Sequence, residues 1–347
     1  MKICIIGHFG GDKEFNDGQT IKTKEIYGYL MKNSLRIETV DTYFLKRKPF
    51  KVFSKIKCGI ANNDAIILIV SSRGYRLIAR FLVKMSKKYN KKVFDFVIGG
   101  MRYKLFDKKP SMKSVAMGFT KIYVETNRMK EEYMKRGIKN VDVVPNFKDL
   151  KQFPAKKDYI KSNELKACIF SRIIKEKGIS DAVEAVSIAN GKNDGVEYSL
   201  DIYGSVSDEY SNEFYDLLSK NKAFVRYEGV ADSKKSSEVI NRHDVLLFPT
   251  YWKGEGFPGT IIDAFFAATP VIATDWNDNF EILEDGKNGI KIKIKSPNEI
   301  ADAMEKIAHD KKYLAVMSSE SCEEAKNYRP EEAMRPFMFD LGYTDEK

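Results

Sequence analysis

The stretch from Gly254 to Ala264 contains the residues of this chain best suited to chemistry. Two carboxylates, Glu255 and Asp263, are separated by seven residues. The residues between them include three turn formers, Gly256, Pro258 and Gly259. A strand, a glycine-rich turn and a helix N-terminus together form an anion site, because backbone N–H groups converge there and the helix dipole favours negative charge. A phosphate cradle beside two carboxylates that can bind hydroxyls fits a nucleotide-sugar.

The residues on either side predict the elements that position this stretch. The apolar run from Asp244 to Pro249 is a strand candidate, and a helix is predicted from Thr260 to Ala268. Glu255 then lies in the loop before the helix, and Asp263 lies about one turn into it, from where it can point back at a bound ligand. The alternative interpretation is a surface turn on an ordinary α/β sheet, since glycine-rich turns before helices are common.

Here the chain resembles the retaining GT-B glycosyltransferases of family 4, and within them the bacterial polysaccharide-assembly branch. The resemblance rests on Glu255 to Phe257, on Asp263-Ala264 and on Ala268 to Asp275, which follow the Glu-x7-Glu signature of that family. It implies that Glu255 binds hydroxyls of the donor sugar and that Asp263 binds the ribose. It also implies nucleotide-sugar contacts from Gly256, Phe257, Pro258, Gly259 and Thr260. Asp263 departs from the family's Glu and is one methylene shorter, which puts the ribose contact in question.

A second motif follows the predicted strand Leu165–Phe170. Arg172 and Lys177-Gly178 lie where the next helix starts, and two cations there are unfavourable with respect to the helix dipole unless an anion lies between them. The two positions match the family pattern Arg-x4-Lys-Gly. The resemblance implies that Arg172 and Lys177 grip the donor diphosphate and neutralise charge as the leaving group departs. A solvated loop with ordinary surface charges is the alternative.

Several glycines follow predicted strands. Gly204 ends the strand Tyr198–Tyr203, where the family has a turn that approaches the nucleotide, although a plain strand-ending glycine is equally consistent. By resemblance, Gly10 and Gly11 face the donor phosphates across a cleft, with Gln19, Thr20 and Lys22 as weaker candidates beside them. Gly99 stands where many relatives carry a histidine that contacts the donor sugar, and this departure leaves the sugar and the activity itself in question.

Length and periodicity indicate two α/β domains. A chain of 347 residues suggests two domains of ordinary size. Both halves alternate strand and helix patterns, which favours parallel, doubly wound sheets. The resemblance implies the GT-B fold, with two Rossmann-like domains facing a cleft. Residues 1–150 would form the acceptor-binding, membrane-facing domain and residues 158–330 the nucleotide-sugar-binding domain. The final helix, 331–347, would pack back on the first domain, and the polar segment 148–158 would be the linker.

The predicted elements are short. The strand candidates are Lys2–Ile6, Ile37–Val40, Asp64–Val70, Lys92–Val97, Lys121–Val124, Val141–Val144, Leu165–Phe170, Tyr198–Tyr203, Ala223–Tyr227, Asp244–Phe248 and Pro270–Ala273. The helix candidates are Thr20–Lys32, Tyr75–Asn90, Arg128–Arg136, Ile179–Asn190, Thr260–Ala268 and Glu331–Leu341.

The net charge of +10 is unevenly distributed, with roughly +18 on residues 1–150 and roughly −8 on the remainder. No helix-turn-helix, zinc-finger or RRM pattern accompanies the basic residues, so nucleic acid is not an expected partner. Thr42–Lys57 and Tyr75–Lys92 mix aromatic or aliphatic residues with cations, and such segments can lie on anionic membranes. The alternative is that their apolar sides pack on the protein's own sheet and their cations are solvated.

Metal chemistry and secretion are not expected. The three histidines and four cysteines are scattered, and no Asp-x-Asp occurs, so neither a cofactor nor a metal is predicted. No apolar run reaches the length of a membrane span, and the first residues form a strand pattern rather than a signal peptide. We therefore expect a cytoplasmic protein that can bind peripherally at the inner face of the membrane.

The sequence as a whole favours a retaining hexosyltransferase that is independent of metal. It would move a sugar from an NDP-sugar, most simply a UDP-sugar, to a saccharide acceptor that is expected to be lipid-linked. Two alternatives remain open at this point: a nucleotide-sugar epimerase, and a non-catalytic GT-B-like partner subunit of another transferase. A nicotinamide-dependent dehydrogenase explains nothing between Arg172 and Asp263.

Overall fold

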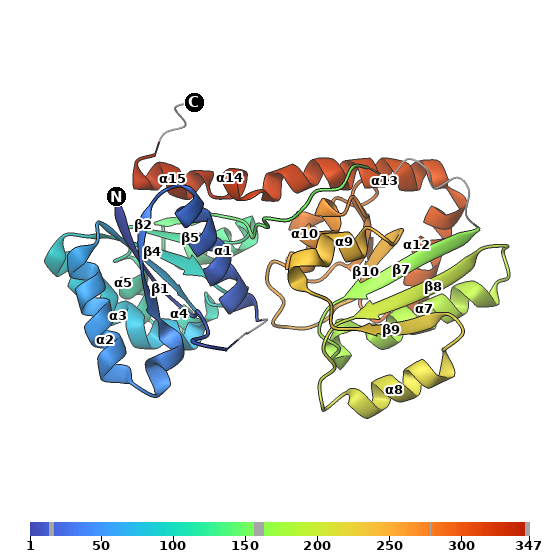
Figure 1. Ribbon diagram of the computed structural model, residues 1–347, viewed down its shortest axis with the longest axis horizontal. Helices are drawn as coiled ribbons and strands as arrows, with labels where there is room; N and C mark the ends of the chain where they lie inside the picture. Colours follow the sequence, from blue (N-terminus) through green and yellow to red (C-terminus); the bar gives the residue numbers. More distant parts are fainter. Residues whose placement is uncertain (14–16, 156–162, 278, 344–347) are drawn as a thin grey trace. The chain divides into compact units, whose positions relative to one another are not determined.

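The computed structural model describes residues 1–13, 17–155, 163–277 and 279–343 (Figure 1). The chain divides into two compact units. Unit 1 comprises Met1–Asn146 together with Pro330–Lys347, and unit 2 comprises Phe147–Arg329. The predicted linker residues 156–158, and residues 344–347 of the predicted final helix, lie outside the described residues. Within the described ranges, no helix combines the length and apolar character that a bilayer span requires.

Unit 1 alternates strands and helices along the chain. Its strands are β1 (Lys2–Gly7), β2 (Arg36–Asp41), β3 (Ala65–Val70), β4 (Lys92–Val97), β5 (Lys121–Val124) and β6 (Val141–Val143). Its helices are α1 (Gly18–Lys32), the 3₁₀ helix η1 (Thr42–Lys46), α2 (Pro49–Asn62), α3 (Ser72–Tyr89), α4 (Lys104–Lys108), α5 (Ser111–Ala116), α6 (Asn127–Lys135), α14 (Pro330–Ala333) and α15 (Arg335–Leu341).

The sheet of unit 1 is parallel, with strand order β2-β1-β3-β4-β5-β6 in the described residues. The order reverses between β1 and β3, so the loops that leave the carboxyl ends of these two strands diverge to opposite faces. Every residue of β3 is buried, as expected for a strand with helices on both faces. Helices α2, α3, α5 and α6 cover one face of the sheet and form a single core with it.

The end of the chain completes the other face of this sheet. Phe337 of α15 packs edge-on against Phe94, Phe96 and Tyr123, with ring centroids 5.1 to 5.6 Å apart. Asp340 accepts a hydrogen bond from the Tyr123 hydroxyl and pairs with Lys121 at 3.2 Å. Helix α15 therefore belongs to unit 1 by packing, although it follows unit 2 in sequence.

A buried ion pair fixes the loop after β4. Arg102 donates to both carboxylate oxygens of Asp95 at 2.9 and 2.8 Å and also to the carbonyl of Val70 at the end of β3. Its guanidinium lies 4.9 Å from the ring centre of Tyr75. Burial raises the pKa of the Asp95 carboxyl, and Arg102 opposes that rise. The bidentate contact and the shared burial make the two side chains one structural unit.

Unit 2 repeats the alternation. Its strands are β7 (Glu164–Phe170), β8 (Glu197–Tyr203), β9 (Val225–Gly229), β10 (Val245–Phe248), β11 (Val271–Thr274) and β12 (Gly289–Ile292). Its helices are the 3₁₀ helix η2 (Lys175–Lys177), α7 (Ile179–Gly191), α8 (Ser211–Lys220), η3 (Ser233–Lys235), α9 (Ser236–Ile240), α10 (Gly259–Phe266), α11 (Asn279–Ile282), α12 (Pro297–His309), α13 (Lys311–Glu324) and η4 (Ala325–Tyr328).

The sheet of unit 2 is also parallel among the described residues, with strand order β12-β11-β10-β7-β8-β9. The order reverses between β7 and β10, which places the switch point of this sheet between these two strands. Helices α7 and α12 cover one face, and α9 and α10 cover the other. The prediction of two parallel, doubly wound α/β domains is confirmed.

The differences from the predicted elements have local causes. Strand β12 was not predicted, because Lys291 interrupts the apolar pattern of its four residues. The single helix predicted for Glu331–Leu341 is wrong: α14 and α15 are separate helices, and Pro336 lies in the first turn of α15. The basic segment Thr42–Lys57 folds as η1 and most of α2.

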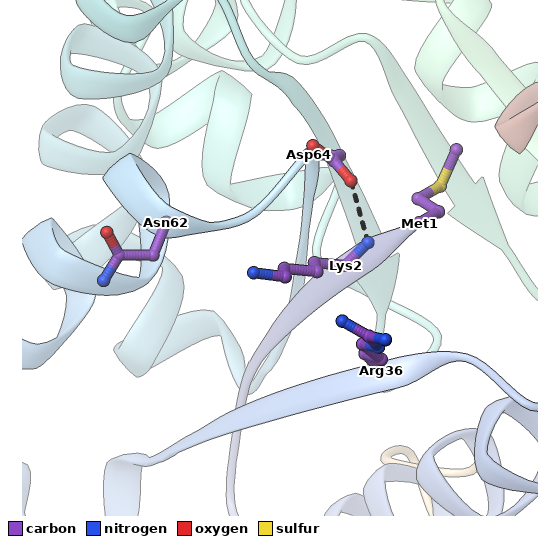
Figure 2. Close-up of a pocket in the computed structure, with 5 residues that line it drawn as sticks. All are labelled: Met1, Lys2, Arg36, Asn62 and Asp64. Carbon is purple, nitrogen blue, oxygen red and sulfur yellow. Dashed lines mark hydrogen bonds between the residues drawn. The ribbon is translucent and has the colours of Figure 1, made fainter.

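The amino ends of β1, β2 and β3 surround an open hollow of about 460 Å³ in unit 1. Figure 2 shows its lining, in which the backbone N–H of Lys2 donates to Asp64 at 2.8 Å. Arg36 and Asn62 complete the wall. Ligands of doubly wound sheets bind at the carboxyl ends of the strands, so this hollow lies at the opposite edge from the expected site.

The buried pair in unit 1 gives a stability prediction. Replacing Arg102 with Ala should lower the free energy of unfolding by about 3–5 kcal/mol, because it leaves the Asp95 carboxylate buried without its partner. Urea unfolding followed by circular dichroism measures this loss. The control is Lys135→Ala, which removes an exposed pair with Glu132 and should change the free energy by less than about 1 kcal/mol. Equal effects of the two substitutions would contradict the role given to Arg102.

Candidate functional site

The candidate site of unit 2 lies at the switch point between β7 and β10. These strands are direct neighbours, with Cys168 opposite Leu246. The loop after β7 carries Arg172 and Lys177, and the loop after β10 carries Glu255. Two loops that are far apart in sequence therefore leave the same edge of the sheet side by side. The fold brings together the three residues for which the sequence predicted a catalytic role.

Lys177 and Glu255 form a buried ion pair. The ammonium nitrogen of Lys177 lies 2.5 Å from Oε2 of Glu255, and the two side chains are only 8 and 10% exposed. Thr250 also donates to Oε2, at 3.3 Å. Among the residues that the structure describes, none donates to the other oxygen, Oε1. Glu255 is thus held from one side and keeps one oxygen available for a hydroxyl.

Arg172 takes a different position from Lys177. It is exposed, and its guanidinium lies over the ring of Trp252 at 5.0 Å from the centroid. Lys177 approaches the same ring at 5.5 Å and the ring of Phe248 at 5.1 Å. The cluster holds two cations and one carboxylate, so it carries a net positive charge that favours an anionic ligand.

Two glycines allow the loops to approach this closely. Gly178 has a φ of +69°, and a Cβ atom there would lie 2.2 Å from the carbonyl oxygen of Pro249, directly after β10. Gly204 has a φ of +144°, and a Cβ atom there would lie 1.7 Å from the carbonyl of Ser171, next to Arg172. Both positions require glycine for packing. The predicted nucleotide contact of Gly204 stays a prediction.

The residues after Glu255 form the start of α10. Pro258 occupies the N-cap position, Gly259 is the first helical residue, and no side chain caps the helix. The hydroxyl of Thr260 donates to the carbonyl of Phe170 at 3.1 Å, which ties the helix start to the end of β7. The uncapped N–H groups of this turn and the helix dipole are the features of an anion site.

Two residues of the predicted set are turned towards the protein interior. The ring of Phe257 packs edge-on against Tyr328 at 5.6 Å, so any contact of this residue with a sugar would come from its backbone. Asp263 is buried in α10, with Oδ1 4.0 Å from the ammonium of Lys148. Burial raises the pKa of the Asp263 carboxyl, and Lys148 opposes that rise. Oδ1 accepts no hydrogen bond from the described residues.

The last residue of β11 and the residues that follow it donate hydrogen bonds to the loop that carries Glu255. The hydroxyl of Thr274 donates to the carbonyl of Thr250 at 2.5 Å, and the indole N–H of Trp276 donates to the carbonyl of Trp252 at 3.0 Å. The side-chain amide of Asn277 donates to the carbonyl of Glu255 at 3.3 Å. Three backbone carbonyls of this loop, those of Thr250, Trp252 and Glu255, therefore accept hydrogen bonds from side chains, which fixes the path of the loop backbone.

In unit 1, backbone N–H groups of the glycine loop after β1 already donate hydrogen bonds to a side chain of the protein itself. The backbone N–H groups of Phe9 and Gly11 donate to the carboxylate of Asp41 at 3.0 and 2.8 Å. Gly10 and Gly11 both have positive φ, at 93° and 58°. The backbone N–H of Gly11, which the sequence predicts to face phosphate, has an internal anion as its partner in this structure.

Two other candidate site residues of unit 1 also have partners within the protein. Lys22 forms a buried pair with Glu125 at 2.6 Å, and the Thr20 hydroxyl donates to Asp17 at 2.7 Å. Gly99, at the position of the family histidine, has a φ of +82° and open space around a Cβ. Its backbone conformation, not crowding, therefore favours glycine here.

No metal centre is evident in the described part of the chain, since no three His, Cys, Asp or Glu residues gather in a group that could hold an ion. Arg172 and Lys177 are the cations beside Glu255 in the candidate site. Their positive charge favours an anionic ligand.

Comparison with known proteins places this geometry in a family. The family model described as "Glycosyl transferases group 1" matches residues 151–325, which is half of the chain and includes Arg172, Lys177 and Glu255. The chain belongs to the glycosyl transferases group 1 family. The matches to the two curated relatives described next each cover less than half of the chain.

Among the curated proteins that match this group 1 chain, two are similar to it at low identity. It is 23% identical over 167 residues to the uncharacterized glycosyltransferase MJ1069 of Methanocaldococcus jannaschii, which is 48% of this chain and 41% of that protein. It is 29% identical over 141 residues to the capsular polysaccharide biosynthesis glycosyltransferase CapM of Staphylococcus aureus, which is 40% of this chain and 35% of CapM. The matches thus span well under half of each relative's length.

A solved structure matches this group 1 chain over nearly its whole length. The structure of HepE from Anabaena in complex with UDP-glucose has a TM-score of 0.74 and 14% identity, and the match covers 99% of both chains. At this identity the match shows the fold alone. The predicted GT-B fold, with two Rossmann-like domains of six parallel strands each in the described residues, is confirmed.

Sequence reasoning missed the residues of this family member that support the motif. Trp252, Trp276 and Asn277 contact the loop that carries Glu255 or the cations beside it, yet none belongs to a motif with a known spacing. One signal was available. The chain has two tryptophans, and both follow strands on the carboxyl side of the unit 2 sheet.

Gly178 provides a test of the close approach between the two loops. Replacing Gly178 with Ala should destabilise the chain by about 2 kcal/mol or more, because an L-residue at this φ is strained and its Cβ would meet the Pro249 carbonyl. The thermal unfolding midpoint measures the effect. The matched control is Gly191→Ala at the end of the same helix, where a Cβ meets nothing within 4 Å. A Gly178 variant as stable as the Gly191 variant would contradict the steric argument.

Proposed function

We propose that this protein is a retaining glycosyltransferase of family 4. It would transfer a sugar from a UDP-sugar to a saccharide acceptor in the assembly of a bacterial surface polysaccharide or glycan. The observation that carries the proposal is the convergence of Arg172, Lys177 and Glu255 at the switch point of unit 2, in front of the uncapped start of α10. Two cations, a carboxylate and a helix N-terminus match a donor made of a diphosphate and a sugar.

The choice of donor and of biological role draws on the related proteins. HepE, which shares the fold over its full length, was crystallised with UDP-glucose and with UDP, and this supports a uridine nucleotide. CapM is described as a capsular polysaccharide biosynthesis glycosyltransferase, and this supports a polysaccharide product. The acceptor we propose is a growing saccharide, linked to a lipid.

The proposed reaction proceeds on one face of the sugar. An acceptor hydroxyl oxygen bonds to the anomeric carbon as the bond from that carbon to the β-phosphate oxygen breaks. The departing phosphate oxygen accepts the proton of the acceptor hydroxyl, so no protein base is needed. Arg172 and Lys177 neutralise the charge that develops on the diphosphate, which is the kind of preorganised stabilisation that dominates many enzymes. Glu255 binds sugar hydroxyls through Oε1, and Asp263 is proposed to bind the ribose.

The two cations also support transfer without a metal ion. A divalent cation in other enzymes neutralises the diphosphate, and here Arg172 and Lys177 carry equivalent charge at the proposed position of the diphosphate. We therefore propose that no cofactor is required, and that activity persists in the presence of a chelator.

The central test separates donor binding from transfer. Glu255→Gln should retain UDP binding, seen as a rise in the thermal midpoint with UDP in EDTA, because the diphosphate contacts remain. Its rate of UDP release from a UDP-sugar with acceptor should fall by about 100-fold or more, since the amide loses the charge that balances Lys177 and orients the sugar. The wild type should show midpoint shifts with UDP and not with GDP, ADP or NAD.

The control for this test is Glu323→Gln, which alters an exposed carboxylate on α13 that pairs with the surface residue Lys326. It should leave both measurements unchanged. Near-normal transfer by the Glu255 variant would contradict the proposed site. No midpoint shift of the wild type with any nucleotide would contradict UDP-sugar transfer and favour a non-catalytic partner subunit.

We also propose that unit 1 binds peripherally to an anionic membrane on its cytoplasmic face. From Thr42 to Lys92 the chain has fourteen lysines and arginines and a single carboxylate, Asp64. Helices α2 and α3 lie side by side, joined by an edge-on contact of Phe53 and Phe81 at 5.2 Å. The cations of both helices are exposed, and so is Phe50 at 91%. An exposed aromatic ring among cations suits a lipid surface.

Vesicle binding tests this surface. The protein should pellet with vesicles containing phosphatidylglycerol and not with phosphatidylcholine alone at low salt, because each cation near an anionic surface contributes about 1 kcal/mol. Phe50→Ser should weaken binding by about tenfold, the effect of losing the burial of one aromatic side chain. The matched control is Phe339→Ser, which removes another exposed phenylalanine of unit 1, on α15. Equal pelleting with both lipid compositions would contradict the proposal.

A further inference from the structure

The two tryptophans of the chain, Trp252 and Trp276, both lie in the loops of the unit 2 site. Trp252 is in the loop that leads from β10 to Glu255, and Trp276 follows β11. Neither ring belongs to the buried core of unit 2, where the large apolar side chains of this unit otherwise gather. A large aromatic ring placed in a loop beside charged groups indicates a role at the site, not in the core.

Trp252 contacts both of the cations that are proposed to bind the donor diphosphate. The Arg172 guanidinium lies 5.0 Å from its ring centre and the Lys177 ammonium lies 5.5 Å from it. Glu255 balances only one of these charges, through its contact with Lys177. The π face of an indole attracts cations, so Trp252 offsets part of the repulsion between the two side chains.

The position of the ring is itself fixed by neighbouring residues. The carbonyl of Trp252 accepts the hydrogen bond of the Trp276 indole at 3.0 Å. The ring packs on Gly254 so closely that a Cβ atom at that glycine would lie 2.6 Å from it. The position of the indole is therefore fixed, and this fixes the positions of the Arg172 and Lys177 side chains that contact its ring.

We propose that Trp252 is a positioning residue that presents Arg172, and to a lesser extent Lys177, to the diphosphate of the donor. This inference rests on the proposed UDP-sugar transfer. Arg172 is exposed and forms no ion pair with the described residues, so without the ring its long side chain would sample many rotamers. Holding the guanidinium in place before the donor arrives lowers the ordering cost of binding. Trp252 itself need not touch the donor.

Two substitutions of Trp252 distinguish the contribution of its aromatic face from the contribution of its packing. Leu and Phe are both smaller than Trp and lose packing against Gly254, but only Phe keeps an aromatic face. Trp252→Leu should raise the dissociation constant for UDP about tenfold, equivalent to about 1.4 kcal/mol. Trp252→Phe should stay within about threefold of the wild type, because it keeps a weaker π face. The thermal midpoints of the two ligand-free variants should be similar, which shows that packing losses are alike.

A double-substitution cycle tests whether Trp252 acts through Arg172. Arg172→Gln alone should weaken UDP binding, measured by calorimetry. In that background, Trp252→Leu should cause little further loss, because the group that the ring positions is already absent. A residue that merely supports the fold would give losses that add.

Tryptophan emission provides a readout that stability does not affect. UDP binding should change the emission of the wild type, because Arg172 shifts its interaction from the indole to the phosphates. The change should be largely lost in Trp252→Phe, which still contains Trp276 and still binds UDP.

The outcomes distinguish this inference from the proposed function. If wild type binds UDP while Trp252→Leu binds it equally well, or if the losses of Trp252→Leu and Arg172→Gln add fully, the positioning role is wrong and the donor assignment stands. An emission change that persists undiminished in Trp252→Phe would also overturn it. If wild type binds no UDP, the proposed function fails first. A tenfold loss for Leu, its rescue by Phe and non-additivity with Arg172→Gln would together establish the role.

Discussion

The buried ion pair of Lys177 and Glu255 is the interaction on which the geometry of unit 2 depends. Removing two charges from water costs several kcal/mol for each, and their attraction offsets this cost only when the geometry is close and further hydrogen bonds are made. The pair meets these conditions with a 2.5 Å contact and a second donor, Thr250. It can form because Gly178 lets the start of α7 approach the carbonyl of Pro249. A backbone constraint thus determines where two charges can meet.

The strands and the charged motif residues were predictable, because their signals are local. The fully apolar run of β3 and the spacing of Glu255 and Asp263 are visible along the chain, and so is the pair of cations after β7. The contacts between loops were not predictable, since Trp252 meets Arg172 only after the two strands pair in space. The burial of Asp263 beside Lys148 depends on the path of the segment after residue 147, and no local pattern records that path.

Each unit contains a glycine-rich turn, and the backbone N–H groups of the two turns differ in their hydrogen-bond partners. In unit 1, Asp41 accepts the N–H groups of Phe9 and Gly11. In unit 2, no side chain caps the start of α10. A glycine-rich turn after a strand can therefore bind an internal carboxylate or remain open to an external anion. Sequence signals for such turns identify the backbone shape, and only the surrounding side chains determine whether the anion site is occupied.

The packing of α15 on the sheet of unit 1 has a consequence for how the chain folds during synthesis. Unit 2 is continuous in sequence, whereas unit 1 receives Phe337 and Asp340 only after all of unit 2 has left the ribosome. Until then, the faces of Phe94 and Phe96 lack their cover, and domains that wait for a late segment are exposed to aggregation. The unit that begins first is thus the last to be completed, and a chaperone bound to that apolar face during translation would protect it until release.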